Sequence, residues 1–109
     1  MTRRKNNDKQ LEEKLGYIKG KFEVLDEQPE FLTSWQGRNE ARDHYGGAIR
    51  GRLCDWAVSG FTERVDTSIC LALARFVGDI SNDDLARIAV LYSADGDLLV
   101  DVEKLTLGF

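Results

Sequence analysis

The sequence predicts a mainly α-helical fold, a compact bundle of four to five short helices around a central apolar helix over residues 65–80. Apolar residues recur at spacings of three and four along much of the chain, as on one face of a helix. The stretch SICLALARFV, residues 68–77, carries one charge, Arg75. A helix that is apolar on nearly all sides is normally buried among its neighbours. We therefore expect residues 65–80 to be the most buried helix, with Phe76 in the core.

Residues 1–7 are predicted to be a polar flexible tail, and residues 8–109 a single globular domain. From Asp8, apolar residues follow spacings of 4, 3, 4 and 3, which indicates one amphipathic helix with Asn7 or Asp8 as its cap. The stripe consists of Leu11, Leu15, Ile18, Phe22 and Leu25. Alternating residues over 18–24 would also suit a strand, but the longer stripe favours a helix. Gln28-Pro29 ends this helix, and Pro29 suits the first turn of a second helix that carries Phe31, Leu32 and Trp35.

Residues 39–56 are predicted to form a further helix, which Gly46-Gly47 either kinks or opens to a close neighbour. Its apolar face would consist of Ala41, Tyr45, Ala48, Ile49, Leu53 and Trp56. We expect Leu53 and Trp56 to belong to the core, and Arg50 to be a solvated charge.

The last quarter of the chain begins with a helix-capping signature, Ser81-Asn82-Asp83-Asp84, in which Ser81 is the N-cap. The helix that follows carries Leu85, Ile88, Ala89 and Tyr92 on one side. Residues 94–97 indicate a turn. Beyond it, residues 98–107 fit a small C-terminal strand or hairpin, or else a helix, and both alternatives stay open.

Composition limits the class of protein. A chain of 109 residues with 42% hydrophobic content is large enough to bury a core without metals or disulfides. No apolar run approaches the roughly 20 residues that cross a bilayer, and no apolar stretch follows the basic N-terminus as in a secretory signal. We expect Cys54 and Cys70 to be reduced and the protein to be cytoplasmic.

The charges are unevenly distributed along the chain. The net charge is −4, but residues 1–52 hold 11 Lys and Arg against nine Asp and Glu, whereas residues 53–109 hold four against ten. Such a chain can present a basic and an acidic surface. The overall acidity argues against a general nucleic-acid binder.

No motif predicts catalysis, a metal site or a cofactor. Asp43 and the single histidine, His44, are adjacent, and adjacent helical residues do not face one another. His44, Cys54 and Cys70 lack the paired short spacing of zinc modules. The Asp-Gly-Asp at 95–97 lacks the glycine and bidentate glutamate of a calcium loop. We expect a non-enzymatic protein, with an enzyme acting through His44 and Cys54 as the weakest alternative.

Nucleic-acid binding is the second hypothesis. Residues 80–105 fit a helix-turn-helix, but the would-be recognition segment carries Asp97, Asp101 and Glu103 against Lys104. Carboxylates repel phosphates, so this segment disfavours nucleic acid. The alternative function is therefore a nucleic-acid-associated regulator that uses the N-terminal Arg-Arg-Lys and the arginines at 38–52.

Residues 35–56 contain the candidate site, because they hold both tryptophans and four arginines. Arginine and large aromatic residues are enriched at protein interfaces. The predicted partner-binding residues are Trp35, Arg38, Arg42, Tyr45 and Arg52. In the competing interpretation the arginine stems cover the rim of a buried stripe. A rival acidic surface, for a basic partner, comprises Asp95, Asp97 and Asp101.

The expected function is a protein–protein interaction module, a small cytoplasmic binder, adaptor or inhibitor that occupies a surface of another protein. Compact acidic chains of this size are common among accessory proteins of phages and mobile elements. A second copy of the chain, forming a homodimer, is a further candidate partner.

Overall fold

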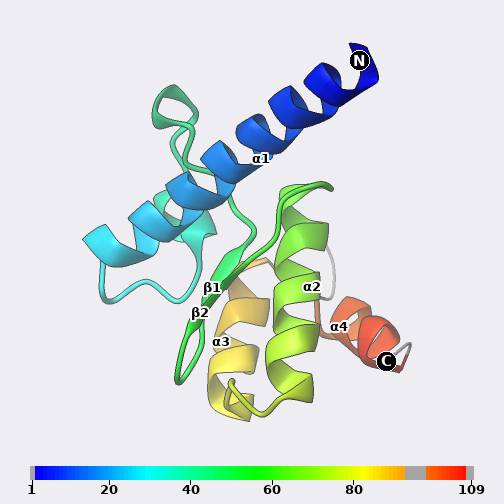
Figure 1. Ribbon diagram of the computed structural model, residues 1–109. Coiled ribbons are helices and arrows are strands. Elements are labelled where there is room, and N and C mark those ends of the chain that lie inside the picture. The colour runs from blue at the N-terminus through cyan, green and yellow to red at the C-terminus, as the bar shows by residue number, and fades with distance from the viewer. Residues whose placement is uncertain (1, 93–97, 108–109) are drawn as a thin grey trace.

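The computed structural model describes the backbone of residues 2–92 and 98–107, with the side chains of 9–92, 98 and 101–105. The described chain is mainly helical, as predicted, with a small antiparallel sheet (Figure 1). Its elements are α1 (Thr2–Glu27), the 3-10 helices η1 (Ser34–Gly37) and η2 (Glu40–Arg42), strands β1 (Ala48–Arg50) and β2 (Asp55–Ala57), α2 (Glu63–Phe76), α3 (Asn82–Leu91) and α4 (Leu98–Leu107).

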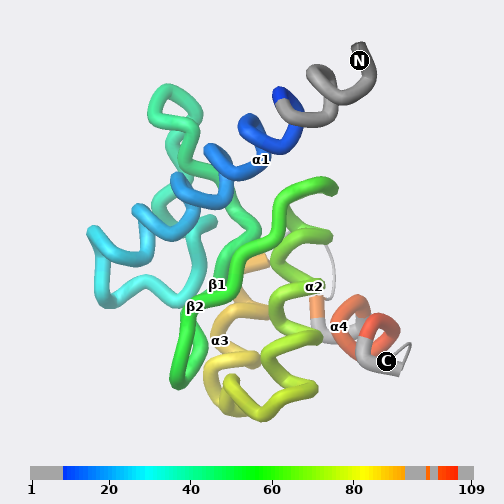
Figure 2. The backbone as a smooth tube through the Cα atoms, in the orientation of Figure 1, coloured from blue at the N-terminus to red at the C-terminus, as the bar shows by residue number. Residues whose placement is uncertain are grey.

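Helix α1 lies across the rest of the fold, and its N-terminal end extends past the other elements (Figure 1, Figure 2). It starts at Thr2, so the expected cap at Asn7 or Asp8 is wrong. It ends at Glu27, next to Gln28-Pro29 as predicted. Its C-terminal half packs on the hairpin and on η1, and Leu25 is fully buried there.

The predicted helix over 39–56 is wrong, because this segment forms η2 and the β1–β2 hairpin. Ala48 pairs with Ala57, Ile49 with Trp56 and Arg50 with Asp55. Gly47 adopts a φ of +115°, and a Cβ there would lie 2.5 Å from Nζ of Lys21. Glycine is therefore needed here because the backbone turns with a positive φ and a buried lysine lies directly over it, and not because a helix is kinked.

Two expectations for the hairpin are also wrong. Leu53, expected in the core, is 92% exposed in the hairpin loop. Arg50, expected to be solvated, donates to the main-chain oxygens of Leu25, Gln28 and Phe31. Trp56 is half-buried against the core. The expected second helix after Pro29 is reduced to the single 3-10 turn of η1.

Helix α2 starts at Glu63 and is capped by Thr62, whose side chain accepts from the main-chain nitrogen of Val65. It contributes buried residues to the core, but the predicted core position of Phe76 is wrong, because this ring is 64% exposed at the end of the helix. Val65 is exposed as well, so α2 is not buried on all sides. The buried α2 side chains are Asp66, Thr67, Ser68, Cys70, Leu71, Ala72 and Ala74.

The C-terminal elements are helices. Ser81 accepts from the main-chain nitrogen of Asp84 and caps α3 as predicted. Residues 98–107 form α4, so of the two open alternatives the structure has the helix and not the strand or hairpin. The turn predicted at 94–97 lies outside the described residues. Helix α4 packs against α2 and α3 and buries Leu98 and Val102.

Candidate functional site

Three of the five predicted partner-binding residues lie together. The guanidinium carbon of Arg38 is 5.7 Å from the ring centroid of Trp35 and 5.7 Å from that of Tyr45. Tyr45 in turn meets Tyr17 of α1 edge-on, with the ring centroids 5.6 Å apart. The segment from η1 to the start of the hairpin therefore stacks an arginine and two aromatic rings beside α1, in an arrangement that cation–π attraction stabilises.

Arg38 is also bound by carboxylates of its own chain. Its Nε donates to Glu63 at 2.9 and 3.0 Å, and its Nη2 donates to Glu40 at 2.9 Å. These contacts, that to Glu63 foremost, raise the pKa of Arg38. Glu63 also accepts from the main-chain nitrogen of Gly46. The positive charge that the sequence offers to a partner is thus already matched inside the fold.

The other two predicted residues lie elsewhere. Arg42 pairs with Glu27 at the end of α1, 3.0 Å away. Arg52 lies exposed in the hairpin loop, where its main-chain nitrogen donates to the Asp79 main-chain oxygen at 2.7 Å. The five residues therefore do not form one continuous surface.

Only one of the three residues of the rival acidic surface, Asp101, belongs to the described part of the chain. Asp101 of α4 pairs with Arg64 of α2 at 2.9 Å, and Arg64 also donates to the main-chain oxygen of Tyr92. Asp101 thus helps to fasten α4 to the helices beside it. Asp95 and Asp97 lie outside the described residues.

A pocket of about 620 Å³ opens between the middle of α1 and the start of α2. Four aromatic residues contribute to its wall: Tyr17, Trp35, Tyr45 and Phe61. Lys14 lies at its rim, because a Cβ built on Gly60 would be 3.8 Å from the lysine Nζ. Apart from Trp35 and Tyr45, sequence reasoning missed these residues.

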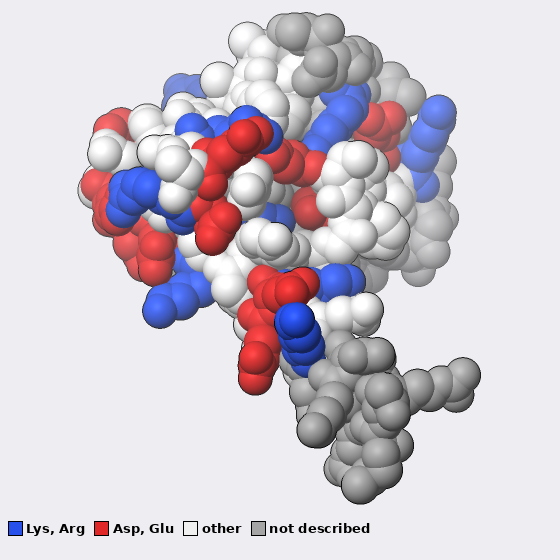
Figure 3. All heavy atoms as spheres, turned by 90° about the horizontal axis from the view of Figure 1, so that it is seen from above, with Lys and Arg blue, Asp and Glu red and all other residues white. Residues whose placement is uncertain are grey.

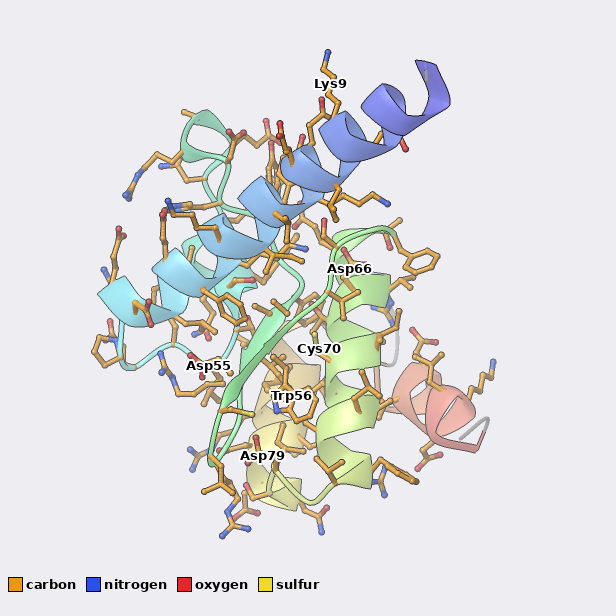
Figure 4. All side chains as sticks on the ribbon, in the orientation of Figure 1. Lys9, Asp55, Trp56, Asp66, Cys70 and Asp79 are labelled. Atoms are coloured by element: carbon orange, nitrogen blue, oxygen red, sulfur yellow. The ribbon has the colours of Figure 1, made fainter. Side chains whose placement is uncertain are left out.

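A buried ion pair forms one wall of this pocket. Lys21 of α1 lies 3.3 Å from Asp66 of α2, with both side chains 3% exposed. Lys21 also donates to the main-chain oxygen of Val58, and Asp66 accepts from the main-chain nitrogen of Phe61. Figure 4 shows Asp66 at the start of α2, beneath α1. These bonds tie α1, the hairpin and α2 together, and so fix the shape of the pocket.

Phe61 of the pocket wall is 70% exposed. Beside the pocket, α1 carries a strip of exposed apolar residues. Leu11 and Leu15 are 57% and 53% exposed. Residues three and four apart share one side of a helix, so these leucines lie next to Lys14 and Ile18. The sequence stripe that predicted α1 contains them, but no sequence signal separates its exposed leucines from its buried Leu25.

The groups considered for catalysis are held in structural contacts. His44 is 3% exposed and its Nε2 lies 3.2 Å from Glu23, so this histidine packs inside the fold. Desolvation and the neighbouring Asp79 raise the pKa of the Cys54 thiol, and burial raises the pKa of Cys70 to about 12. Both shifts disfavour the thiolate that a cysteine nucleophile needs.

Cys54 and Cys70 are both free thiols. Over residues 2–92 and 98–107, no cluster of three or more His, Cys, Asp or Glu is arranged to hold a metal ion. Across the same ranges, no helix combines the length and hydrophobicity that a membrane span requires.

The surface seen from above mixes both signs of charge (Figure 3). Basic and acidic side chains both occur over this face. The pairs Lys21–Asp66 and Arg38–Glu63 join cations of residues 1–52 to carboxylates of residues 53–109, so folding brings together charges that the sequence separates. No protein-family model, curated protein or solved structure matches the chain.

Proposed function

We propose that this protein is a non-enzymatic protein-binding module, a small adaptor or inhibitor whose partner docks on α1 and the pocket beside it. The exposure of Leu11 and Leu15 on one side of α1 carries the proposal. Single exposed apolar residues are ordinary, but an apolar strip that is rimmed by charge and lies beside a pocket is typical of interaction sites. The rim includes Lys14, Glu12 and Glu13, all exposed.

This surface modifies the site predicted from the sequence. Trp35 and Tyr45 remain in it, as pocket residues. Arg38, which is paired with Glu63, lies against the rings of Trp35 and Tyr45 and supports them. Arg42 and Arg52 lie outside the pocket lining. We propose that the protein acts in a reducing compartment, the cytoplasm, and the two free thiols support this location.

The nucleic-acid alternative fits the arginines less well. Arg38 and Arg42 are paired with carboxylates, and Arg50 binds main-chain oxygens. Affinity for nucleic acid comes mainly from cations free to neutralise phosphates. Salt-dependent retention of the protein on a DNA column would support this alternative against the one proposed.

The proposal is tested by photo-crosslinking followed by reconstitution. A photo-reactive amino acid is placed at Leu15 or, as the matched control, at Val90 of α3, which is 71% exposed. We expect a discrete crosslinked protein in native-host cells from position 15 alone, which is then identified and purified.

The affinity for this purified partner is then measured by calorimetry. The double variant Leu11→Gln/Leu15→Gln should lose about tenfold or more in affinity, since interface energy concentrates in a few large side chains. Val90→Gln should bind as the unchanged protein does, and both should keep the melting temperature. Equal crosslinking at the two positions, or unchanged binding by the double variant, would overturn the proposal.

A further inference from the structure

We propose that the pocket between α1 and α2 recognises an acidic peptide segment of the partner, which inserts a large apolar side chain and sets a carboxylate against Lys14. This inference rests on the proposed function and names the chemistry of its partner. It follows from the size of the pocket, from its aromatic wall and from the balance of charges around it.

The size and wall of the pocket fit a bulky apolar group. A volume of about 620 Å³ lies within the range of about 300–1,000 Å³ that is usual for ligand pockets. Tyr17, Trp35, Tyr45 and Phe61 offer ring surface, and rings prefer edge or offset contact with another aromatic group. Tyr17 and Tyr45 already form such an edge contact with each other. A tryptophan, phenylalanine or leucine side chain would therefore find apolar surface on several sides.

The charges around the pocket leave one cation without a partner. The two pocket carboxylates are matched, Asp66 by Lys21 and Glu63 by Arg38. The Arg64 guanidinium is matched by Asp101 of α4. Within the part of the chain that the structure describes, Lys14 has no hydrogen-bond or ion-pair partner.

The pocket is lined by three cations, Lys14, Lys21 and Arg64, and by two carboxylates, Glu63 and Asp66. This excess of one positive charge in the lining favours an anionic group beside the apolar one. A matching carboxylate in the partner would steer its approach and select it against neutral or basic segments. The exposed strip of Leu11 and Leu15 borders Lys14 on α1, so the segment extends beyond the pocket along the helix. A second copy of the chain is the competing occupant.

The test uses three synthetic hexapeptides as probes with the full chain. The first is acetyl-Gly-Asp-Trp-Asp-Leu-Gly-amide, and the other two replace both aspartates by asparagine or by lysine. Titrations are followed by the amide chemical shifts of the isotopically labelled protein. We expect the shifts to centre on the pocket and the affinity to fall from the acidic to the neutral to the basic peptide.

The charge contribution is isolated with two lysine variants. Lys14→Gln should weaken the acidic peptide about two- to fivefold, as expected for an exposed ion pair, and leave the neutral peptide unchanged. Lys9→Gln is the matched control, since Lys9 is exposed on α1 and points away from the body (Figure 4). Phe61→Ala should weaken all three peptides, because the ring is pocket surface.

Several results would overturn the inference. These are equal affinity for the three peptides, equal losses in Lys14→Gln and Lys9→Gln, and shifts away from the pocket. Sedimentation showing a concentration-dependent dimer that the acidic peptide does not dissociate would assign the pocket to a second copy instead. If these results occur while Leu11→Gln/Leu15→Gln still abolishes binding of the purified partner, the proposed function stands and its named chemistry fails.

Discussion

The Nη2 atom of Arg50 donates to the main-chain oxygen of Leu25 at 2.6 Å, so a residue of the hairpin closes the C-terminal end of α1. The last four carbonyls of a helix have no partner within the helix, and the last turn of α1 contains no basic residue of its own. Arg50 also reaches Gln28 and Phe31, so one side chain satisfies three main-chain oxygens.

Arg50→Ala should therefore lower the free energy of unfolding by about 1–3 kcal/mol, because it leaves partly buried acceptors unpaired. Arg52→Ala, an exposed neighbour in the same hairpin, should change it by less than about 0.5 kcal/mol. Urea denaturation of the two variants gives both values. If the losses were equally small, Arg50 would be the solvated charge that the sequence suggested.

Gly16 and Gly20 of α1 should respond to alanine with opposite signs. A Cβ at Gly16 meets nothing within 4 Å, so Gly16→Ala should stabilise the helix by about 0.5–1 kcal/mol. A Cβ at Gly20 would lie 2.6 Å from the main-chain oxygen of Asp43. Gly20→Ala should therefore cost about 1–3 kcal/mol, as overpacking does.

Thermal and urea unfolding of the two glycine variants measures this contrast. Stabilisation by both would mean that the loop around Asp43 does not lie against α1 as described.

Local signals explain which parts of the fold the sequence predicts. Ser81 caps α3 through contacts three residues away, and Gln28-Pro29 ends α1 through the geometry of the next bond. The hairpin depends on distant contacts instead. Lys21 lies over Gly47, which is 26 positions further along the chain. The spacing of apolar residues in the sequence does not indicate this contact.

The same distinction applies to the candidate site. Its aromatic residues could be found from composition, since Trp35 and Tyr45 do line the pocket. Whether each arginine is free or paired could not be predicted, because the carboxylate partners are remote in sequence. Glu63 is 25 positions from Arg38, and Glu27 is 15 positions from Arg42. Pairing of charges is a property of the folded chain, and among the described residues it distinguishes an unpaired cation such as Lys14 from a neutralised one.

The core of α2 can be located by two truncations. Leu71 is fully buried, so Leu71→Ala should cost about 2–5 kcal/mol through lost burial and a cavity. Phe76 is 64% exposed, so Phe76→Ala should cost about 1 kcal/mol or less. Chemical denaturation should rank the two clearly. If Phe76→Ala lost more unfolding free energy than Leu71→Ala, the Phe76 ring would have to lie in the core.

Asp79 should make the stability of the protein depend on pH in acid. Its carboxylate accepts from the main-chain nitrogens of Leu53 and Cys54, at 2.7 and 3.3 Å, and from Nε1 of Trp56 at 2.8 Å. Figure 4 shows Trp56 on the hairpin with Asp79 close to the hairpin loop. The indole bond foremost, together with the main-chain bonds, lowers the pKa of Asp79, because these donors favour the charged form.

Since the folded pKa lies below the unfolded one, the carboxylate stabilises the fold fully above the ordinary aspartate pKa of about 3.9. That contribution is lost as the pH falls through the lower folded value. Asp79→Asn should therefore be less stable than the unchanged protein near neutral pH, and the difference should shrink towards about pH 3. Trp56→Phe should raise the pKa of Asp79 towards its unfolded value, so the loss of stability in acid should be smaller and should be complete at a higher pH.

Urea midpoints across this pH range measure the loss of stability, and the Asp79 carboxyl resonance measures the pKa directly. Trp56→Phe separates the hydrogen bond from the packing, because it keeps most of an aromatic ring and removes the donor. If the pH profiles of Asp79→Asn and the unchanged protein ran parallel, the carboxylate would not hold the hairpin loop in its charged form.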